Sequence, residues 1–331
     1  MEKQIIFSGI KPSGSLHIGN YLGAIKQFIE LQESNEAFFC IVDLHAITVP
    51  QEPKDLREKT LEVAKIYLAA GMDPEKSTIF IQSHVPAHAE LGWILNTLTP
   101  MGELQRMTQY KNAIARGKSA LAGLFNYPTL MAADILLYHA NKVPVGEDQL
   151  QHVELARSLV ERFNNKYGET FVLPEPILQK ESARIMSIAR PDQKMSKSED
   201  DPKGTIGLLD SPEEIREKIK SAVTDSAKDF DFDPKGPIPN LINIYAGAAK
   251  ITADEVKARF KGKSYAEFKD SLAGAIIEGL TPIQNRYKKL SDSDVLEILY
   301  DGAKSASLIA EKTLTEVKEK LGLLPNPNFN A

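Results

Sequence analysis

A dense group of lysines and serines lies in the second half of the sequence. Two lysines and two serines fall within Lys194–Ser198, inside the polar run 190–204 that also holds two prolines. Lysine contributes a compact positive charge and serine a short hydroxyl donor, so the group suits a triphosphate. The polar, proline-containing surroundings predict a surface loop. Most charge runs are simply solvated surface, and this run alone leaves both interpretations open.

A second candidate for phosphate chemistry lies near the N-terminus. Residues 4–7 are predicted to form a strand, 8–17 a turn rich in glycine, proline and serine, and 18–31 a helix with an apolar stripe. The first N–H groups of such a helix lack intrahelical partners and lie at the positive end of its dipole, which favours phosphate. Gly19 leaves room for a flat ring close to the backbone. Neither common phosphate-loop pattern is present, and His17 alone is more typical of a helix cap than of a catalyst.

Asp134 is a carboxylate within an apolar helical run. Burying a carboxylate is costly unless it is paired, so Asp134 either faces solvent or is met by a donor. Tyr127, Met131, Asp134 and Tyr138 recur at helical spacing and share one face. An aromatic ring, a thioether and one acceptor would form a pocket for a flat apolar ring that carries a single N–H.

Acidic side chains also follow a short predicted strand at Val143–Val145. The next residues are Gly146, Glu147 and Asp148. Carboxylates in this position suit ribose hydroxyls or an ammonium group, and they equally suit the first turn of a helix; both roles can hold together. His45 follows another strand, and a role in orienting that loop is at least as well supported as direct chemistry.

The elements that must position these groups alternate between strand and helix. Strands are predicted at 38–42, 78–82 and 143–145, and helices at 54–70, 87–98 and 149–166. This alternation predicts an α/β fold with a parallel sheet and right-handed crossovers, whose ligands bind beyond the carboxyl ends of the strands. The stretch from about 100 to 140 interrupts the alternation, with a helix expected at 102–111 and a loop at 117–127.

The last third is predicted to be helical. A short extended piece at 205–209 precedes a capping box at Ser211–Glu214. Helices are expected at 212–223, 240–247, 253–259, 264–278, 281–290, 293–301 and 302–321. We predict a catalytic domain at 1–190 with the insertion at about 100–140, and an all-α domain at 191–331 that begins with the lysine–serine loop. The last helix is expected to pack back on the core.

Composition sets further limits. The chain has 331 residues, 42% hydrophobic, and a formal net charge of −5, which is typical of a globular protein of two domains. Its one cysteine, Cys40, excludes an intramolecular disulfide and a cysteine-built metal site. No signal peptide or membrane-spanning run is apparent, so we expect a cytoplasmic protein without a membrane partner. Mild acidity argues against non-specific coating of nucleic acid, but not against local basic patches that bind one RNA.

The pair His17-Ile18-Gly19-Asn20 and Lys194-Met195-Ser196-Lys197-Ser198 resembles the two signatures of class I aminoacyl-tRNA synthetases. Within that class the chain is similar to the bacterial tryptophanyl-tRNA synthetases, from residue 3 to about 322. The matching segments are FSGIKPSGSLHIGNYLGA, FCIVDLHAIT, FIQSHVPAH, GELQRMTQ, LMAADILLY, VPVGEDQ, ARIMS, KMSKS and KSAVTDS. The resemblance implies a Rossmann-like core with an insertion, a helical domain that reads the anticodon of tRNA(Trp), and a homodimer.

The resemblance also implies site residues. Catalytic roles fall to His17, Lys194 and Lys197. ATP, with Mg²⁺ and no protein-built metal site, would be held by Lys11, Pro12, Ser13, Gly19, Asn20, Gly146, Glu147, Asp148, Ile185, Lys194, Met195, Ser196, Lys197 and Ser198. L-tryptophan would be held by Asp134, accepting from the indole N–H, with Phe7, Tyr127, Met131, Val143, Val145 and Gln149 nearby.

Two positions depart from the pattern. Lys11 stands where many members have Gln, and Asn20 stands where the wider class has a second His. The implied activity is formation of tryptophanyl-adenylate and pyrophosphate, followed by transfer to the 3′-terminal ribose of tRNA(Trp). Three alternatives remain: a tyrosyl-type synthetase, an α/β nucleotidyltransferase acting on a small metabolite, and a non-catalytic synthetase-like RNA-binding or regulatory protein.

Overall fold

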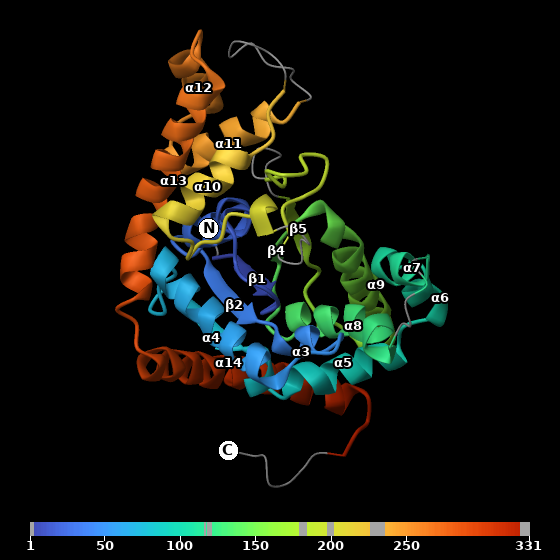
Figure 1. The fold of residues 1–331 in the computed structure, drawn as a ribbon. Coiled ribbons are helices and arrows are strands. Elements are labelled where there is room, and N and C mark those ends of the chain that lie inside the picture. The colour runs from blue at the N-terminus through green and yellow to red at the C-terminus, as the bar shows by residue number, and fades with distance from the viewer. Residues whose placement is uncertain are drawn as a thin grey trace.

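A parallel five-stranded sheet forms the centre of the molecule (Figure 1). This computed structural model describes residues 3–115, 117, 121–178, 184–196, 202–225 and 236–324. The strand order is β3-β2-β1-β4-β5 and every pairing is parallel, so the predicted α/β class is confirmed. The strands are β1 (Ile5–Ile10), β2 (Glu36–Ile41), β3 (Ser77–Ile81), β4 (Lys142–Val145) and β5 (Glu175–Leu178).

Helices cover both faces of the sheet. One face packs on a helix formed by α1 (Ile18–Asn20), the π-helical turn η1 (Tyr21–Ile25) and α2 (Lys26–Leu31), and on α4 (Pro53–Ala70). The other packs on α5 (Ala87–Thr97), α8 (Ala122–Leu136) and α9 (Leu150–Tyr167). Successive side chains of a strand point to opposite faces, so Ile6 and Phe39 join the first core and Phe7 and Phe38 the second.

Short helical turns follow three of the strands directly. They are α3 (Asp43–Ala46) after β2, η2 (Gln82–His84) after β3, and η3 (Glu147–Gln149) after β4. The carboxyl ends of parallel strands meet at one edge of a sheet, so these turns lie along the edge where such folds bind ligands. The stretch predicted as an insertion, about 100–140, contains α6 (Met101–Gln105), α7 (Thr108–Ala115) and also α8. The short turn η5 (Pro202–Gly204) comes later in the chain.

The last third forms a helical layer on α4. It contains α10 (Pro212–Ser221), α11 (Ile238–Ala249), α12 (Ala253–Phe260) and α13 (Tyr265–Tyr287). The predicted capping box at α10 is confirmed: the Glu214 carboxylate accepts from the Ser211 N–H at 2.7 Å. Arg286 in α13 donates its Nε–H to the carbonyl of Ala69, at the end of α4. Figure 1 shows these helices stacked on one side of the sheet, far from α9.

The final helix, α14 (Asp292–Lys320), contacts the edge strand β3 and both layers of the core. Leu299 belongs to the core on the α4 side and Val317 to the core on the α8 side. The Thr313 hydroxyl donates to the carbonyl of Leu137 at 2.8 Å. At Gly302 a Cβ would overlap the backbone carbonyl of Ile79, so only glycine lets the helix approach the strand this closely.

Several predicted boundaries were wrong. The helix expected at 102–111 is divided between α6 and α7, and the loop expected at 117–127 already contains the start of α8. The helices expected at 264–278 and 281–290 are one helix, α13, because buried Leu280 and Ile283 keep its apolar face continuous across Pro282. The helices expected at 293–301 and 302–321 are the single helix α14.

No helix of the described chain is long and apolar enough to cross a bilayer.

The contact at Gly302 gives a prediction about stability. Gly302→Ala should lower the free energy of unfolding by about 1–3 kcal/mol or more, because α14 must move away from β3. Gly274→Ala is the matched control: Gly274 also lies within a helix, but a Cβ there meets nothing within 4 Å. That change should be neutral or stabilising by up to about 1 kcal/mol. Urea unfolding measures both, and equal effects would contradict the account of Gly302.

Candidate active site

A cavity of about 470 Å³ lies beyond the carboxyl ends of β1 and β4. Its lining includes all seven residues predicted to hold tryptophan: Phe7, Tyr127, Met131, Asp134, Val143, Val145 and Gln149. His45, Gly9 and Thr48 also line it, together with two residues predicted to hold ATP, Lys11 and Gly146. The aromatic, thioether and carboxylate side chains on α8 therefore share one space with the ends of two strands.

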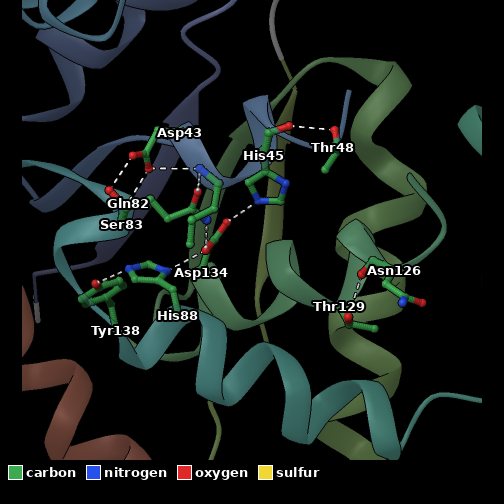
Figure 2. A network of polar contacts seen from close by, with 11 residues as sticks. Asp43, His45, Thr48, Gln82, Ser83, His88, Asn126, Thr129, Asp134 and Tyr138 are labelled. Atoms are coloured by element: carbon green, nitrogen blue, oxygen red, sulfur yellow. Dashed lines mark hydrogen bonds and ion pairs between the residues drawn. The ribbon is translucent and has the colours of Figure 1, made fainter. Parts of the chain in front are cut away.

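Asp134 is buried at one end of this cavity and is met by three donors (Figure 2). Its Oδ1 accepts from Gln82 Nε2 and His88 Nδ1, both at 2.6 Å. Its Oδ2 accepts from His45 Nε2 at 2.8 Å. The donors come from the turns after β3 and β2 and from α5. The sequence left open whether Asp134 faces solvent or is met by a donor, and the structure shows that it is buried and met by donors.

These contacts fix the charge of Asp134. Burial by itself would raise the pKa of the carboxyl, but the charges and hydrogen bonds of His45 and His88 outweigh burial and hold the pKa well below its ordinary value of 3.8. Asp134 is therefore an anion that can only accept hydrogen bonds. Among the described residues Oδ1 has two donors and Oδ2 has one, which leaves an acceptor direction on Oδ2 for a ligand.

Tyr127 forms another wall of the cavity and is held from behind by His152. The Tyr127 hydroxyl lies 2.6 Å from His152 Nε2, and the Tyr127 ring packs edge-on against His45 with centroids 5.9 Å apart. His152 is fully buried, and burial together with the charge of His45 lowers its pKa to about 4, against the opposing charge of Asp148. Burial also raises the pKa of Tyr127. A neutral imidazole thus accepts from a protonated hydroxyl.

Phe7 forms the floor of the cavity and lies on further aromatic rings that do not line it. Phe7 lies parallel to Tyr138, with centroids 5.6 Å apart and an interplanar angle of 6°, and Tyr138 stacks in turn on Phe38 at 4.7 Å. Lys11 also lines the cavity, and burial lowers its pKa. The cavity therefore offers apolar surface for a flat ring, one anionic acceptor and one lysine side chain.

The His17–Asn20 segment begins the helix after β1. His17 is buried at the N-cap, and its backbone N–H donates to Asn20 Oδ1 at 3.1 Å. The space left by Gly19 is taken partly by the His17 ring itself, which lies 3.0 Å from where a Cβ would be. The Ile18 N–H donates to the carbonyl of Ile206 at 2.9 Å. The predicted extended piece at 205–209 thus pairs with the start of this helix.

The described part of the lysine–serine loop lies beside this segment. Lys194 pairs with Met186 in an antiparallel bridge, and the Met195 N–H donates to the carbonyl of Ile185 at 3.1 Å. A Cβ on Gly19 would lie 3.4 Å from Ile185 Cβ, so Ile185 separates the two signatures. Lys197 and Ser198 lie outside the described residues. Lys194 and Ser196 are exposed, and Met195 is buried.

The other residues predicted for ATP lie outside the walls of the 470 Å³ cavity. Glu147 and Asp148 are exposed on η3, and Pro12 and Ile185 are buried beside the helix start.

Sequence reasoning gave no role to four groups that build the site: Gln82, His88, His152 and Asn240. Asn240 Oδ1 accepts from the Met186 N–H at 2.8 Å and ties the loop to α11. The signal in the sequence that donors were needed was a carboxylate, Asp134, within an apolar run.

Comparison with known proteins agrees with this geometry. The family described as "tRNA synthetases class I (W and Y)" matches residues 1–281. This match shows that the chain is a class I synthetase, in agreement with its parallel sheet.

Individual tryptophan–tRNA ligases are similar to this chain over nearly its whole length. The "Tryptophan--tRNA ligase" of Clostridium perfringens is 54% identical over 328 residues, 98% of this chain and 99% of that protein. The tryptophanyl-tRNA synthetase of Mycoplasma pneumoniae matches in structure with a TM-score of 0.89 at 36% identity, over 98% of both chains. The enzyme of Campylobacter jejuni, solved with ADP and tryptophan, matches with a TM-score of 0.84 at 38% identity, over 97% of this chain and 100% of that one. The chain belongs to the tryptophan–tRNA ligase family.

The neutral state of His152 predicts an acid-sensitive fold. The unfolded chain takes up a proton near the ordinary pKa of 6.5, whereas folded His152 does so only near 4, so stability falls as the pH drops through this window. The slope is at most about 1.4 kcal/mol per pH unit. His152→Gln retains an acceptor for Tyr127 but cannot titrate. Urea unfolding between pH 6.5 and pH 4 should show a smaller loss in this variant, and an equal loss would contradict the assignment.

Proposed function

We propose that this chain activates L-tryptophan with ATP and then charges tRNA(Trp). The observation that carries the proposal is the cavity in which Asp134, an anionic acceptor, faces an apolar space for a flat ring. Indole is flat and apolar, and its N–H only donates, so a carboxylate that only accepts is complementary to it. The C. jejuni relative, solved with ADP and tryptophan, supports the use of both a nucleotide and this amino acid.

Tryptophan lies in the cavity with its indole N–H donated to Asp134 Oδ2. Phe7 and Met131 contact its ring and Tyr127 closes over it. Tyrosine would place its hydroxyl oxygen, which is also an acceptor, next to the carboxylate of Asp134. Phenylalanine has no donor, so Oδ2 of Asp134 would lack the hydrogen bond that indole supplies. A site built to bond a polar hydrogen can reject an analogue that lacks it by about 10⁴–10⁵. This favours tryptophan over a tyrosyl-type substrate, in agreement with the relatives.

ATP lies at the mouth of the cavity, across the start of the helix after β1. Gly146, Glu147 and Asp148 meet its ribose and base, and Lys11, His17, Lys194 and Lys197 meet its phosphates with Mg²⁺. A carboxylate oxygen of tryptophan attacks the α-phosphorus in line; the new O–P bond forms as the bond to pyrophosphate breaks. The side chains position the reactants and stabilise the charge that develops on the transferring and leaving groups.

The second step moves the aminoacyl group to RNA. A hydroxyl of the 3′-terminal ribose attacks the carbonyl carbon of the adenylate, AMP leaves with the bonding electrons, and the hydroxyl proton is lost to solvent. The helices α10 to α13 are the part of the chain that reads the anticodon, and residues 1–190 and 191–331 are its catalytic and helical domains. We further propose that the active form is a cytoplasmic homodimer.

Pyrophosphate exchange tests activity and amino acid together. Radiolabel should pass from pyrophosphate into ATP only when tryptophan is added, with tyrosine and phenylalanine inactive at equal concentration. Lys197→Ala should lower the rate of adenylate formation by about 10²–10³, because the variant loses a cation on the leaving group, with little change in tryptophan affinity. Exchange that needs tyrosine instead, or that needs no amino acid, would contradict the proposed function.

A further inference from the structure

We propose that His88 is a positioning residue for amino-acid selection, holding Asp134 from behind and tying it to the aromatic floor of the cavity. The proposal rests on the function given above, in which Asp134 receives the indole N–H. His88 lies on α5, is fully buried and does not line the cavity, so it acts only through its neighbours.

The two ring nitrogens of His88 have different partners. Nδ1 lies 2.6 Å from Asp134 Oδ1, and Nε2 lies 2.7 Å from the Tyr138 hydroxyl. Asp134 is an anion that only accepts, so Nδ1 carries a proton. Burial raises the pKa of Tyr138, and within the described chain its hydroxyl bonds only to His88. The Tyr138 hydroxyl and Nε2 therefore share one hydrogen bond, so each ring nitrogen of His88 has its own partner.

This arrangement restricts the orientation of the carboxylate. Gln82 and His88 occupy Oδ1 from two elements, so the group cannot rotate without breaking two charge-assisted hydrogen bonds. Figure 2 shows His88 and His45 on opposite sides of Asp134. His45 lines the cavity and bonds to Oδ2, which places the remaining acceptor direction at the cavity.

The same imidazole also sets the floor. Tyr138, which is hydrogen-bonded to His88, stacks on Phe7, and Phe7 lines the cavity. The face of a bound indole would lie on Phe7 while its N–H meets Asp134, so the distance between face contact and acceptor is fixed through His88. Loss of His88 should therefore affect tryptophan more than ATP, because the hydrogen bonds of His88 lead to Asp134 and Tyr138 and to no residue proposed for ATP.

Two substitutions separate the two nitrogens. His88→Asn places its amide N–H near Nδ1 and keeps a donor to Asp134, whereas His88→Gln reaches toward Nε2 and loses that donor. In pyrophosphate exchange, His88→Asn should change the KM for tryptophan by less than about threefold. His88→Gln should raise it about 10- to 100-fold, as expected for losing a hydrogen bond to a charged group, with the KM for ATP within about twofold.

A buried polar residue on the other face of the sheet serves as the control. Gln32 is buried, donates to the carbonyl of Gly71 and accepts from the Asp73 N–H, each at 3.0 Å. Gln32→Leu should lower the melting temperature and leave the KM for tryptophan unchanged. If His88→Asn and His88→Gln raise the KM for tryptophan and for ATP alike, in proportion to their loss of stability, His88 has only a structural role and the proposal is overturned.

A measurement on the unsubstituted protein keeps the proposal testable if a variant fails to fold. Nitrogen-15 spectra of labelled protein without ligand should show His88 with its proton on Nδ1 at neutral pH, and the Nε2 signal should shift in Tyr138→Phe. A proton on Nε2 alone would overturn the proposal. This result does not depend on the substrate, so it stands apart from a failure of tryptophan-dependent exchange, which would count against the proposed function instead.

Discussion

The buried negative charge of Asp134 is the interaction on which the rest of the site depends. A buried carboxylate is costly unless paired, and removing one partner of such a pair typically costs about 3–5 kcal/mol. The partners of Asp134 come from the turn after β2, the turn after β3 and from α5, while Asp134 itself lies on α8. Helix α8 can therefore pack correctly only when the ends of two strands are in place, so folding of the core and preparation of the acceptor are one event.

The part of the site that we propose for the nucleotide depends on a different kind of contact. The start of the helix after β1 and the residues before α10 are joined by backbone bonds, Ile18 to Ile206 and Leu208 to Leu16. Asn240 then binds the loop that precedes Lys194 to α11. The helical layer is thus connected to the loop as well as to α4, and a shift of α11 would be transmitted to the residues beside His17. Backbone and amide contacts of this kind hold the loop in place without using the exposed side chain of Lys194.

Local patterns in the sequence were enough to predict four of the five strands and one wall of the cavity, whereas the other cavity residues were assigned from the family resemblance. Runs of three to five residues predicted β1 to β4, and helical spacing placed Tyr127, Met131, Asp134 and Tyr138 on one face. The first three line the cavity, but Tyr138 does not; it stacks behind Phe7. Gln82 and His88 could not be assigned, since their roles depend on which strand ends meet α8. The length of α14 was also predicted wrongly. A glycine such as Gly302 is typical of a helix end, and the reason for it within the helix is the close contact with β3.

Among the residues that we propose to bind tryptophan and ATP, Asp134 has the central role, as the acceptor of the indole N–H. It is tested most directly with a ligand that keeps the shape of tryptophan but replaces the indole N–H by sulfur, 3-benzothienylalanine. Calorimetry on the unsubstituted protein should give a dissociation constant about 10- to 100-fold weaker than for tryptophan, the effect of one hydrogen bond to a charged acceptor. Equal dissociation constants for the two ligands would contradict the account.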